Sequence, residues 1–284
     1  MTDGVLTLQE AADELGVHYM TAYRYVRLGV MEASKAGGVW QVQRSAVDRF
    51  REDAKVAAAT VGPSGNGGPR NRRAPWSSRL ESRLIAGDAP GSWSVIEAAM
   101  AAGAELDEIY LDVLTPAMVA IGERWAAGEL DISIEHRATG IAMRLVGRIG
   151  PRFSRRGRSR GVVALGAPAG EYHALPVAML GDLLRLRGWD VSDFGVDVPS
   201  ESLAHVISQT PDLVAVGLSA MSSDNLASLA DACAAVHVAD PSVLVVVGGH
   251  AVADLDHARS LGADAYAATG HAMDDVLTRH TLAS

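Results

Sequence analysis

The sequence has a single cysteine, Cys233, in 284 residues, and only 5% of its residues are aromatic. One cysteine excludes an internal disulfide framework and a zinc or iron–sulfur site built from several cysteines. No apolar run reaches the roughly 18 residues that a membrane-spanning helix needs. The first ten residues, MTDGVLTLQE, lack the basic start and apolar core of a secretory signal. We therefore expect a cytoplasmic protein without a membrane partner.

Basic residues are scarce in the C-terminal part of the chain. Residues 161–284 contain no lysine and 4 arginines against 15 acidic residues, a net charge of −11. Residues 1–160 contain 21 basic and 19 acidic residues, a net charge of +2. The overall charge of −9 therefore does not exclude DNA binding by the N-terminal part.

Two segments rich in Gly, Pro and Arg, at residues 57–75 and 151–160, divide the sequence into three domains. We expect a multidomain protein with an ordinary globular composition, since 48% of its residues are hydrophobic. Its predicted parts are a winged helix-turn-helix domain over 1–56, a flexible linker over 57–75, a four-helix bundle over 76–150 and an α/β domain over 161–284.

The first domain has the pattern helix, turn, helix, hairpin, helix. Apolar residues recur at helical spacing after Thr7 up to Gly16, a second short helix follows, and Gly37-Gly38 marks a hairpin before a helix from Ser45. This order resembles the winged helix-turn-helix of excisionases and MerR-type regulators, which place the second helix in the major groove of DNA. The alternative is a protein-binding or packing module. The predicted DNA-binding residues are Thr21, Arg24, Tyr25, Arg27, Lys35 and Arg44.

The second domain lacks the alternation of β-strands and is rich in Ala, Leu, Met, Ile and Glu. Its apolar spacing predicts four helices near residues 76–86, 93–102, 105–127 and 132–150. We expect Pro116 to kink or interrupt the third. Trp125, Glu135 and His136 stand out at a helix end and in the following helix, and Trp125 with Glu135 can converge on a ligand across the bundle. The alternative is a core Trp and a surface Glu-His pair.

The third domain alternates apolar strands with helices, which predicts a Rossmann-like doubly wound parallel sheet. The strands are expected near residues 161–168, 191–195, 213–221, 243–249 and 263–270. Ligands of such sheets bind beyond the carboxyl ends of the strands. The distinctive residues at those ends are Glu171, His173, Ser219, Gly248, Gly249 and Gly270.

Glu171 and His173 have the spacing of a metal ligand and its orienting carboxylate. A carboxylate on one ring nitrogen fixes the tautomer of a histidine and leaves the other nitrogen for a metal. A glycine pair such as Gly248-Gly249 lets a bulky group approach the backbone. Taken singly, such a histidine is more often solvated and such a pair is more often a turn. Because no second cluster of ligands is present, a single histidine indicates a metal already held by a macrocycle.

These motifs resemble the cobalamin-binding domains that share Asp-x-His-x-x-Gly, Ser-x-Leu and Gly-Gly. The corresponding stretches here are Glu171-Tyr-His173-Ala-Leu-Pro176, Ser219-Ala-Met221 and Gly248-Gly249. The resemblance implies that His173 is the lower axial ligand of cobalt and that the nucleotide tail of cobalamin enters a slot at these residues. Met221 and Gly270 are included in that site. The departures are Glu for Asp, Pro for Gly and Met for Leu.

The order of the domains resembles the CarH and LitR light-dependent repressors over nearly the whole chain. That family has a Trp followed after nine residues by Glu-His, as in Trp125, Glu135 and His136. The resemblance implies that Trp125 covers the upper face of 5′-deoxyadenosylcobalamin, that Glu135 contacts the adenosyl ribose and that His136 supports the same pocket or an oligomer interface. It also implies a homodimer or homotetramer that binds operator DNA in the dark and is released when light breaks the cobalt–carbon bond.

One departure concerns the light state. Well-known members have a cobalt-ligating histidine directly after the bundle Trp, and here that residue is Ala126. Either His136 or water takes that position, or the protein signals differently. The alternatives are a corrinoid protein that carries methyl groups for a methyltransferase, and a regulator that senses haem or a bilin, with or without cobalamin. The winged helix favours a transcription regulator that is not an enzyme.

Overall fold

The computed structural model describes residues 4–15, 22, 26, 31–36, 39–49, 75–155 and 157–283. These residues belong to two units, Met1–Arg72 and Arg73–Ser284. Most of the second helix expected in the first unit lies outside the described residues, and so do four predicted DNA-binding residues, Thr21, Arg24, Tyr25 and Arg27.

The first unit contains a three-stranded antiparallel sheet in the order β1-β3-β2 and a helix. Its elements are β1 (Val5–Thr7), α1 (Leu8–Leu15), β2 (Ser34–Ala36) and β3 (Val39–Gln43). The pairing of β2 with β3 confirms the predicted hairpin. Strand β1, which pairs with β3, was not predicted. Residues 44–49 are helical, as expected for the helix after the hairpin.

Helix α1 begins with a reciprocal capping arrangement. The backbone N–H of Thr7 donates to Glu10 Oε2 at 2.8 Å, and the backbone N–H of Glu10 donates to Thr7 Oγ1 at 3.3 Å. The apolar side of the helix, with Leu8 and Ala11, is buried against Val42 of the sheet. The helical spacing after Thr7 therefore corresponds to a core-facing side.

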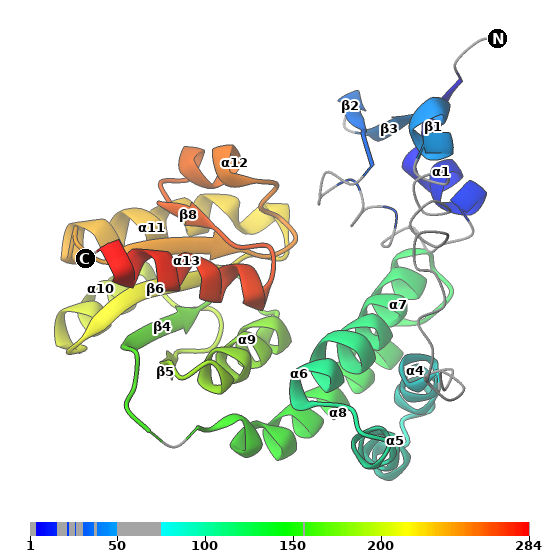
Figure 1. The fold of residues 1–284 in the computed structure, drawn as a ribbon, viewed down its shortest axis with the longest axis horizontal. Coiled ribbons are helices and arrows are strands. Elements are labelled where there is room, and N and C mark those ends of the chain that lie inside the picture. Colours follow the sequence, from blue (N-terminus) through cyan, green and yellow to red (C-terminus); the bar gives the residue numbers. More distant parts are fainter. Residues whose placement is uncertain are drawn as a thin grey trace, which may run out of the picture. The chain divides into compact units, whose positions relative to one another are not determined.

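The second unit begins with the helical bundle (Figure 1). Its elements are α4 (Trp76–Ala86), α5 (Ala89–Ala101), α6 (Leu106–Glu108), the π-helix η1 (Ile109–Leu114), α7 (Thr115–Ala126), α8 (Ile132–Ile149) and the short 3₁₀ helix η2 (Gly150–Phe153). The four predicted helices are confirmed. Helix α5 begins before residue 93, because the Asp88 side chain accepts the backbone N–H of Gly91 at 2.9 Å and caps it.

The third predicted helix changes from α to π and back to α just before Pro116. Proline has no N–H to donate to the carbonyl four residues earlier, and its ring crowds that carbonyl. The π segment is where the helix accommodates this defect. The expected interruption is therefore present.

The α/β part of the second unit is a five-stranded parallel sheet. Its elements are β4 (Val162–Gly166), α9 (Ala174–Leu186), β5 (Asp190–Asp193), α10 (Ser200–Gln209), β6 (Leu213–Ser219), η3 (Ser223–Asn225), α11 (Leu226–Ala239), β7 (Leu244–Gly248), α12 (Leu255–Ser260), β8 (Ala265–Tyr266) and α13 (Gly270–Ala283). All five predicted strands are present, although the last is only two residues long.

The strand order is β5-β4-β6-β7-β8, and helices cover both faces (Figure 1). Helices α9 and α13 pack on one face, where Leu184 and Met273 are buried against strand residues such as Val246. Helices α10, α11 and α12 pack on the other face. The order reverses beside β4, which makes the carboxyl ends of β4 and β6 the place where ligands of such sheets bind. This confirms the doubly wound sheet.

The core of the bundle continues onto helix α9. Met179 and Leu183 of α9 are buried in one cluster with bundle residues such as Ile96 and Leu145. Helix α9 therefore has two packed sides, one on the sheet and one on the bundle. Within the described part of the chain, none of the helices is long and apolar enough to span a membrane.

Candidate functional site

The site is organised around Glu171, a buried carboxylate in the loop after β4. Its Oε2 accepts the backbone N–H groups of Met221 at 2.7 Å and Ser222 at 3.2 Å, and the side-chain amide of Asn225 at 3.1 Å. Its Oε1 accepts the backbone N–H of His173 at 3.1 Å and is also hydrogen-bonded to His173 Nδ1. Glu171 is 1% exposed. It therefore joins the loop after β4 to the loop after β6.

The charge state of Glu171 follows from these contacts. Burial alone raises the pKa of a carboxyl group. The hydrogen bonds from His173, Met221 and Asn225 outweigh burial and lower the pKa of Glu171 to about 2. The ionised carboxylate accepts the proton on His173 Nδ1, which leaves the lone pair of Nε2 free to bind a metal. The His173 side chain is 59% exposed, so a ligand can reach it.

The loop ends where helix α9 begins. His173 is the residue before the first turn of α9, and Pro176 lies within that turn. The first backbone N–H groups of a helix have no partner within it, so proline is tolerated there. The exchange of Gly for Pro, a departure from the cobalamin-binding pattern, is thus compatible with the contact between Glu171 and His173.

The predicted glycines Gly248 and Gly249 lie along the same edge of the sheet, where the chain's own backbone packs closely around them. A Cβ atom on Gly248 would collide with the carbonyl oxygen of Ala267, and one on Gly249 would collide with that of Ala220. Gly249 also has a φ of 95°, which favours glycine. The pair is therefore required by the packing of the chain's own backbone at this edge of the sheet.

The remaining predicted residues are placed as follows. Ser219 ends β6 and lies beside Gly248 in the register of the sheet. Met221 contributes its backbone N–H to Glu171. Gly270 begins α13, where a Cβ atom would lie 3.0 Å from Leu183 Cδ1. Sequence reasoning missed Ser222 and Asn225, although an asparagine soon after the carboxyl end of a strand was a usable signal.

Trp125, Glu135 and His136 lie at one end of the bundle. Trp125 is in the last turn of α7 and is 45% exposed, which is unusual for a tryptophan in a helical bundle. Glu135 accepts the hydroxyl of Thr139 at 2.8 Å, and its other oxygen lies 2.6 Å from His136 Nδ1. The His136 side chain is 71% exposed. Because residues 127–131 join α7 directly to α8, these side chains belong to the same bundle end.

Two of the predicted DNA-binding residues lie in the described part of the first unit. Lys35 is exposed on β2, and its Nζ lies 5.7 Å from the centre of the Trp40 ring. Arg44 forms an ion pair with Glu14 of α1, and its side chain remains 52% exposed. Both are placed beside the hairpin, as predicted.

The residues described in the structure contain no group of three or more His, Cys, Asp or Glu side chains that could hold a metal ion. The single imidazole of His173, oriented by Glu171, is a donor set that fits a metal held by a corrin macrocycle. Cys233 is fully buried in α11, and burial raises the pKa of its thiol to about 12. A buried neutral thiol does not favour covalent attachment of a bilin.

Three family models match this chain. A B12 binding domain matches residues 161–277, a second B12 binding domain model matches residues 76–149, and a helix-turn-helix domain matches residues 5–55. The protein thus combines a helix-turn-helix domain with B12-binding domains formed by the bundle and the parallel sheet.

Individual relatives agree with this class. The chain is 32% identical over 181 residues to the HTH-type transcriptional repressor CarH of Myxococcus xanthus, a match that covers 62% of this chain and 58% of the repressor. The chain is 27% identical over 195 residues to a trimethylamine corrinoid protein of Methanosarcina barkeri, covering 65% of this chain and 85% of that protein. The structure of the monomethylamine corrinoid protein of Methanosarcina barkeri has the same fold, with a TM-score of 0.63 and 21% identity over 72% of this chain and 98% of that chain. The match with CarH thus extends over less than two thirds of that repressor.

Proposed function

We propose that the protein is a light-responsive, cobalamin-dependent transcription regulator of the cytoplasm. The observation that carries the proposal is the Glu171–His173 pair at the carboxyl edge of the sheet, in a chain that also has a helix-turn-helix domain. The proposed domains are 1–56 for DNA binding, 57–75 as linker, 76–150 as the cap over cobalamin and 161–284 for cobalamin binding. The similarity to CarH supports regulation rather than catalysis.

The sheet residues are proposed to hold the lower side of cobalamin. His173 Nε2 binds cobalt, and Glu171 keeps the imidazole in the required tautomer and orientation. The nucleotide tail enters at the edge of the sheet formed by Ser219, Met221, Gly248, Gly249 and Gly270.

The bundle residues are proposed to hold the upper side. The exposed ring of Trp125 covers the adenosyl group, Glu135 accepts a hydrogen bond from its ribose, and His136 supports that pocket or an oligomer interface. When bound, adenosylcobalamin supplies a cobalt–carbon bond that light can break. If one bundle position binds the intact upper group better than the other, losing that group shifts the population of the two positions.

DNA binding is assigned to Thr21, Arg24, Tyr25, Arg27, Lys35 and Arg44. A dimer or tetramer places several such units on one operator, which raises the affinity over that of one unit. Release of the operator in the light then follows from dissociation of the oligomer.

The experiment is size-exclusion chromatography with absorbance detection on protein loaded with adenosylcobalamin, in the dark and after green light. We expect a spectral change together with a decrease in mass. Trp125→Ala should keep bound cobalamin but lose the mass change, whereas Ile132→Ala, which removes a similarly exposed apolar side chain at the same bundle end, should behave like the parent. Bound cobalamin with an unchanged mass after illumination would overturn the light response.

A second candidate function is a corrinoid carrier of methyl groups. The similarity to the trimethylamine corrinoid protein favours it, because the match covers 85% of that protein. The match of residues 5–55 to a helix-turn-helix domain opposes it, because a methyl carrier has no need of DNA. Operator selection from random DNA distinguishes the two, and an Arg24→Ala variant should lose the selected binding while its cobalamin spectrum stays unchanged.

A further inference from the structure

Asp182 of helix α9 joins the sheet domain to the bundle. The hydroxyl of Tyr110, a fully buried residue of η1, donates to Asp182 Oδ2 at 2.7 Å. Burial, followed by the contact with Asp182, raises the pKa of Tyr110, so the hydroxyl remains a hydrogen-bond donor. Asp182 is 6% exposed, and its Oδ1 accepts Arg185 Nη1 at 3.0 Å. The hydrogen bond from Tyr110 is therefore a buried polar contact across the boundary of the two domains.

The backbone around Asp182 is closely packed. A Cβ atom on Gly150 would lie 2.9 Å from Asp182 Oδ2, so a larger residue there would displace the carboxylate of Asp182. The ring of Phe153 stacks on Tyr110 with 4.6 Å between the ring centres. The bundle is thus held against α9 at one defined position.

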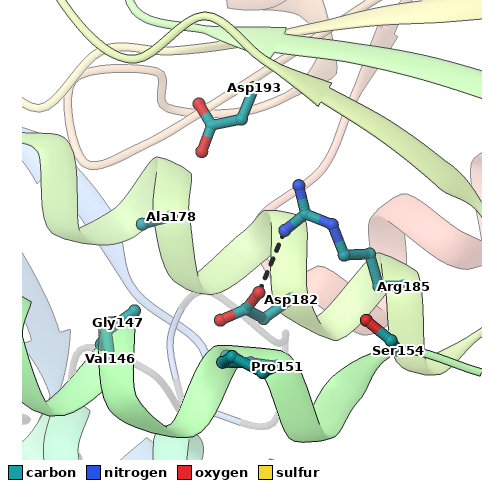
Figure 2. Close-up of a pocket in the computed structure, with 9 residues that line it drawn as sticks. Val146, Gly147, Pro151, Ser154, Ala178, Asp182, Arg185 and Asp193 are labelled. Carbon is teal, nitrogen blue, oxygen red and sulfur yellow. Dashed lines mark hydrogen bonds and ion pairs between the residues drawn. The ribbon is translucent and has the colours of Figure 1, made fainter.

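A second carboxylate, that of Asp193, lines the same cavity as Arg185. The cavity, of about 340 Å³, lies between the end of α8 and helix α9, and Asp193 lines it on the side away from Asp182 (Figure 2). Asp193 accepts the backbone N–H of Gly195 at 2.8 Å. In the described part of the chain no ion pair joins it to Arg185. The Arg185 side chain is 31% exposed and borders the cavity. Its Nη2 donates to the backbone carbonyl of Val191 at 3.2 Å, so the guanidinium already reaches β5, the strand that carries Asp193.

We propose that Arg185 exchanges partners between Asp182 and Asp193, and that this exchange holds or frees the bundle on helix α9. With Arg185 on Asp182, the carboxylate is neutralised in its buried position and accepts Tyr110. With Arg185 on Asp193, the buried charge of Asp182 is left with Tyr110 alone, and the contact between the domains weakens. Two discrete arrangements of one side chain are the kind of element that a switch requires.

Helix α9 links this exchange to the cofactor site. The helix begins directly after His173 and carries Asp182 and Arg185 on the same rigid element. A shift of His173 on binding cobalt is therefore transmitted to the contact with Tyr110. This link rests on the proposed function, whereas the exchange itself does not.

The change of ion-pair partner is tested by amide hydrogen–deuterium exchange on the full chain without cobalamin. The rates are measured at residues 109–114 and 178–186. Asp182→Asn should raise the hydrogen exchange rates of these residues by about three- to tenfold, because the buried hydrogen bond from Tyr110 is weakened. Asp193→Asn should lower them by about two- to fivefold, because the open arrangement loses its ion pair. Tyr110→Phe, which keeps the ring stacked, serves as a second opening variant if Asp182→Asn folds poorly.

The matched control is Asp274→Asn. Asp274 likewise accepts hydrogen bonds from an aromatic residue and an arginine, Trp189 Nε1 at 2.8 Å and Arg160 Nη1 at 2.9 Å, but neither partner belongs to the bundle. The Asp274→Asn variant should leave the hydrogen exchange rates of residues 109–114 unchanged. Equal effects of Asp182→Asn and Asp274→Asn at residues 109–114, or increased exchange in Asp193→Asn, would overturn the exchange of partners.

A second experiment repeats the hydrogen–deuterium exchange measurement with hydroxocobalamin bound. Cobalamin should change protection of residues 109–114 in the parent and in Asp274→Asn, and should not do so in Asp182→Asn. A bound cofactor without any change in the parent would overturn the link to His173. Absence of cobalamin binding by absorbance would overturn the proposed function, while the cofactor-free measurement would still decide the exchange of partners.

Discussion

Two glutamates among the described residues contact a histidine one or two positions further along the chain, and the two pairs differ in their surroundings. In both, the glutamate contacts Nδ1 of a histidine whose side chain is more than half exposed. Glu171 is almost fully buried and accepts hydrogen bonds from groups on two loops. The Glu135 side chain is 24% exposed and is hydrogen-bonded to residues of its own helix.

The difference shows what the wider contacts of Glu171 add. A ligand of a metal must be held in direction as well as in protonation state, and direction is fixed by contacts that come from outside the local segment. His173 has such contacts through the loop after β6, whereas His136 relies on one turn of α8. The first pair is therefore held in a fixed direction, as a metal ligand requires, whereas the second is held by its own helix alone.

The largest expected difference between the pairs comes from removing the histidines. His173→Ala should weaken hydroxocobalamin binding by more than about 100-fold. Removing only the orienting partner of a metal ligand costs about 10- to 100-fold in affinity, and removing the ligand itself should cost more. His136→Ala, the matched control, should stay within about threefold of the parent. Titration by absorbance measures both, and similar spectra and affinities for the parent and His173→Ala would remove His173 as the axial ligand.

Changing the glutamates should give a smaller difference. Glu171→Gln should weaken cobalamin binding by about 10- to 100-fold. It should also lower the free energy of unfolding by about 1–3 kcal/mol, because buried N–H groups of Met221 and Ser222 lose a charged acceptor. Glu135→Gln should leave stability nearly unchanged. Denaturant unfolding without cobalamin measures this contrast, which equal losses in the two variants would contradict.

The smallest expected effect separates the two faces of the cofactor. Glu135→Gln should weaken binding of adenosylcobalamin by about fivefold, the value of roughly one hydrogen bond, and should leave binding of hydroxocobalamin unchanged. Glu171→Gln should weaken both cobalamins equally. Calorimetry with the two cobalamins gives the ratio, and an equal loss for both in Glu135→Gln would remove its assigned contact with the adenosyl group.

Much of the fold was predictable because it depends on local patterns. Helical spacing and short apolar strands determined the bundle and the parallel sheet, and the rule for carboxyl ends placed Glu171 and His173 at the carboxyl edge of the sheet. The start of α5 could also have been predicted from the sequence, since Asp88 is a good N-capping residue. Strand β1 was not, because three residues carry too little periodicity to indicate a strand.

The contacts that distinguish the site were beyond sequence reasoning. Asn225 and the backbone of Ser222 reach Glu171 from a segment about 50 residues away, and Tyr110 reaches Asp182 from another domain. No local pattern encodes such pairings, because they depend on how finished elements pack. The close packing at Gly248 and Gly249 was equally beyond sequence reasoning, since the carbonyl groups of Ala267 and Ala220 that they accommodate belong to other segments of the chain.

The sheet edge at Gly248 and Gly249 has a consequence for how such a protein can diversify. Its surface there consists of peptide groups whose positions are set by the strands, so ordinary substitutions have no side chain at that point through which to reshape it. Under the proposed function, recognition of a different upper group therefore requires substitutions in the bundle or in the loop after β4. The edge of the sheet then serves as a constant base for proteins of this architecture.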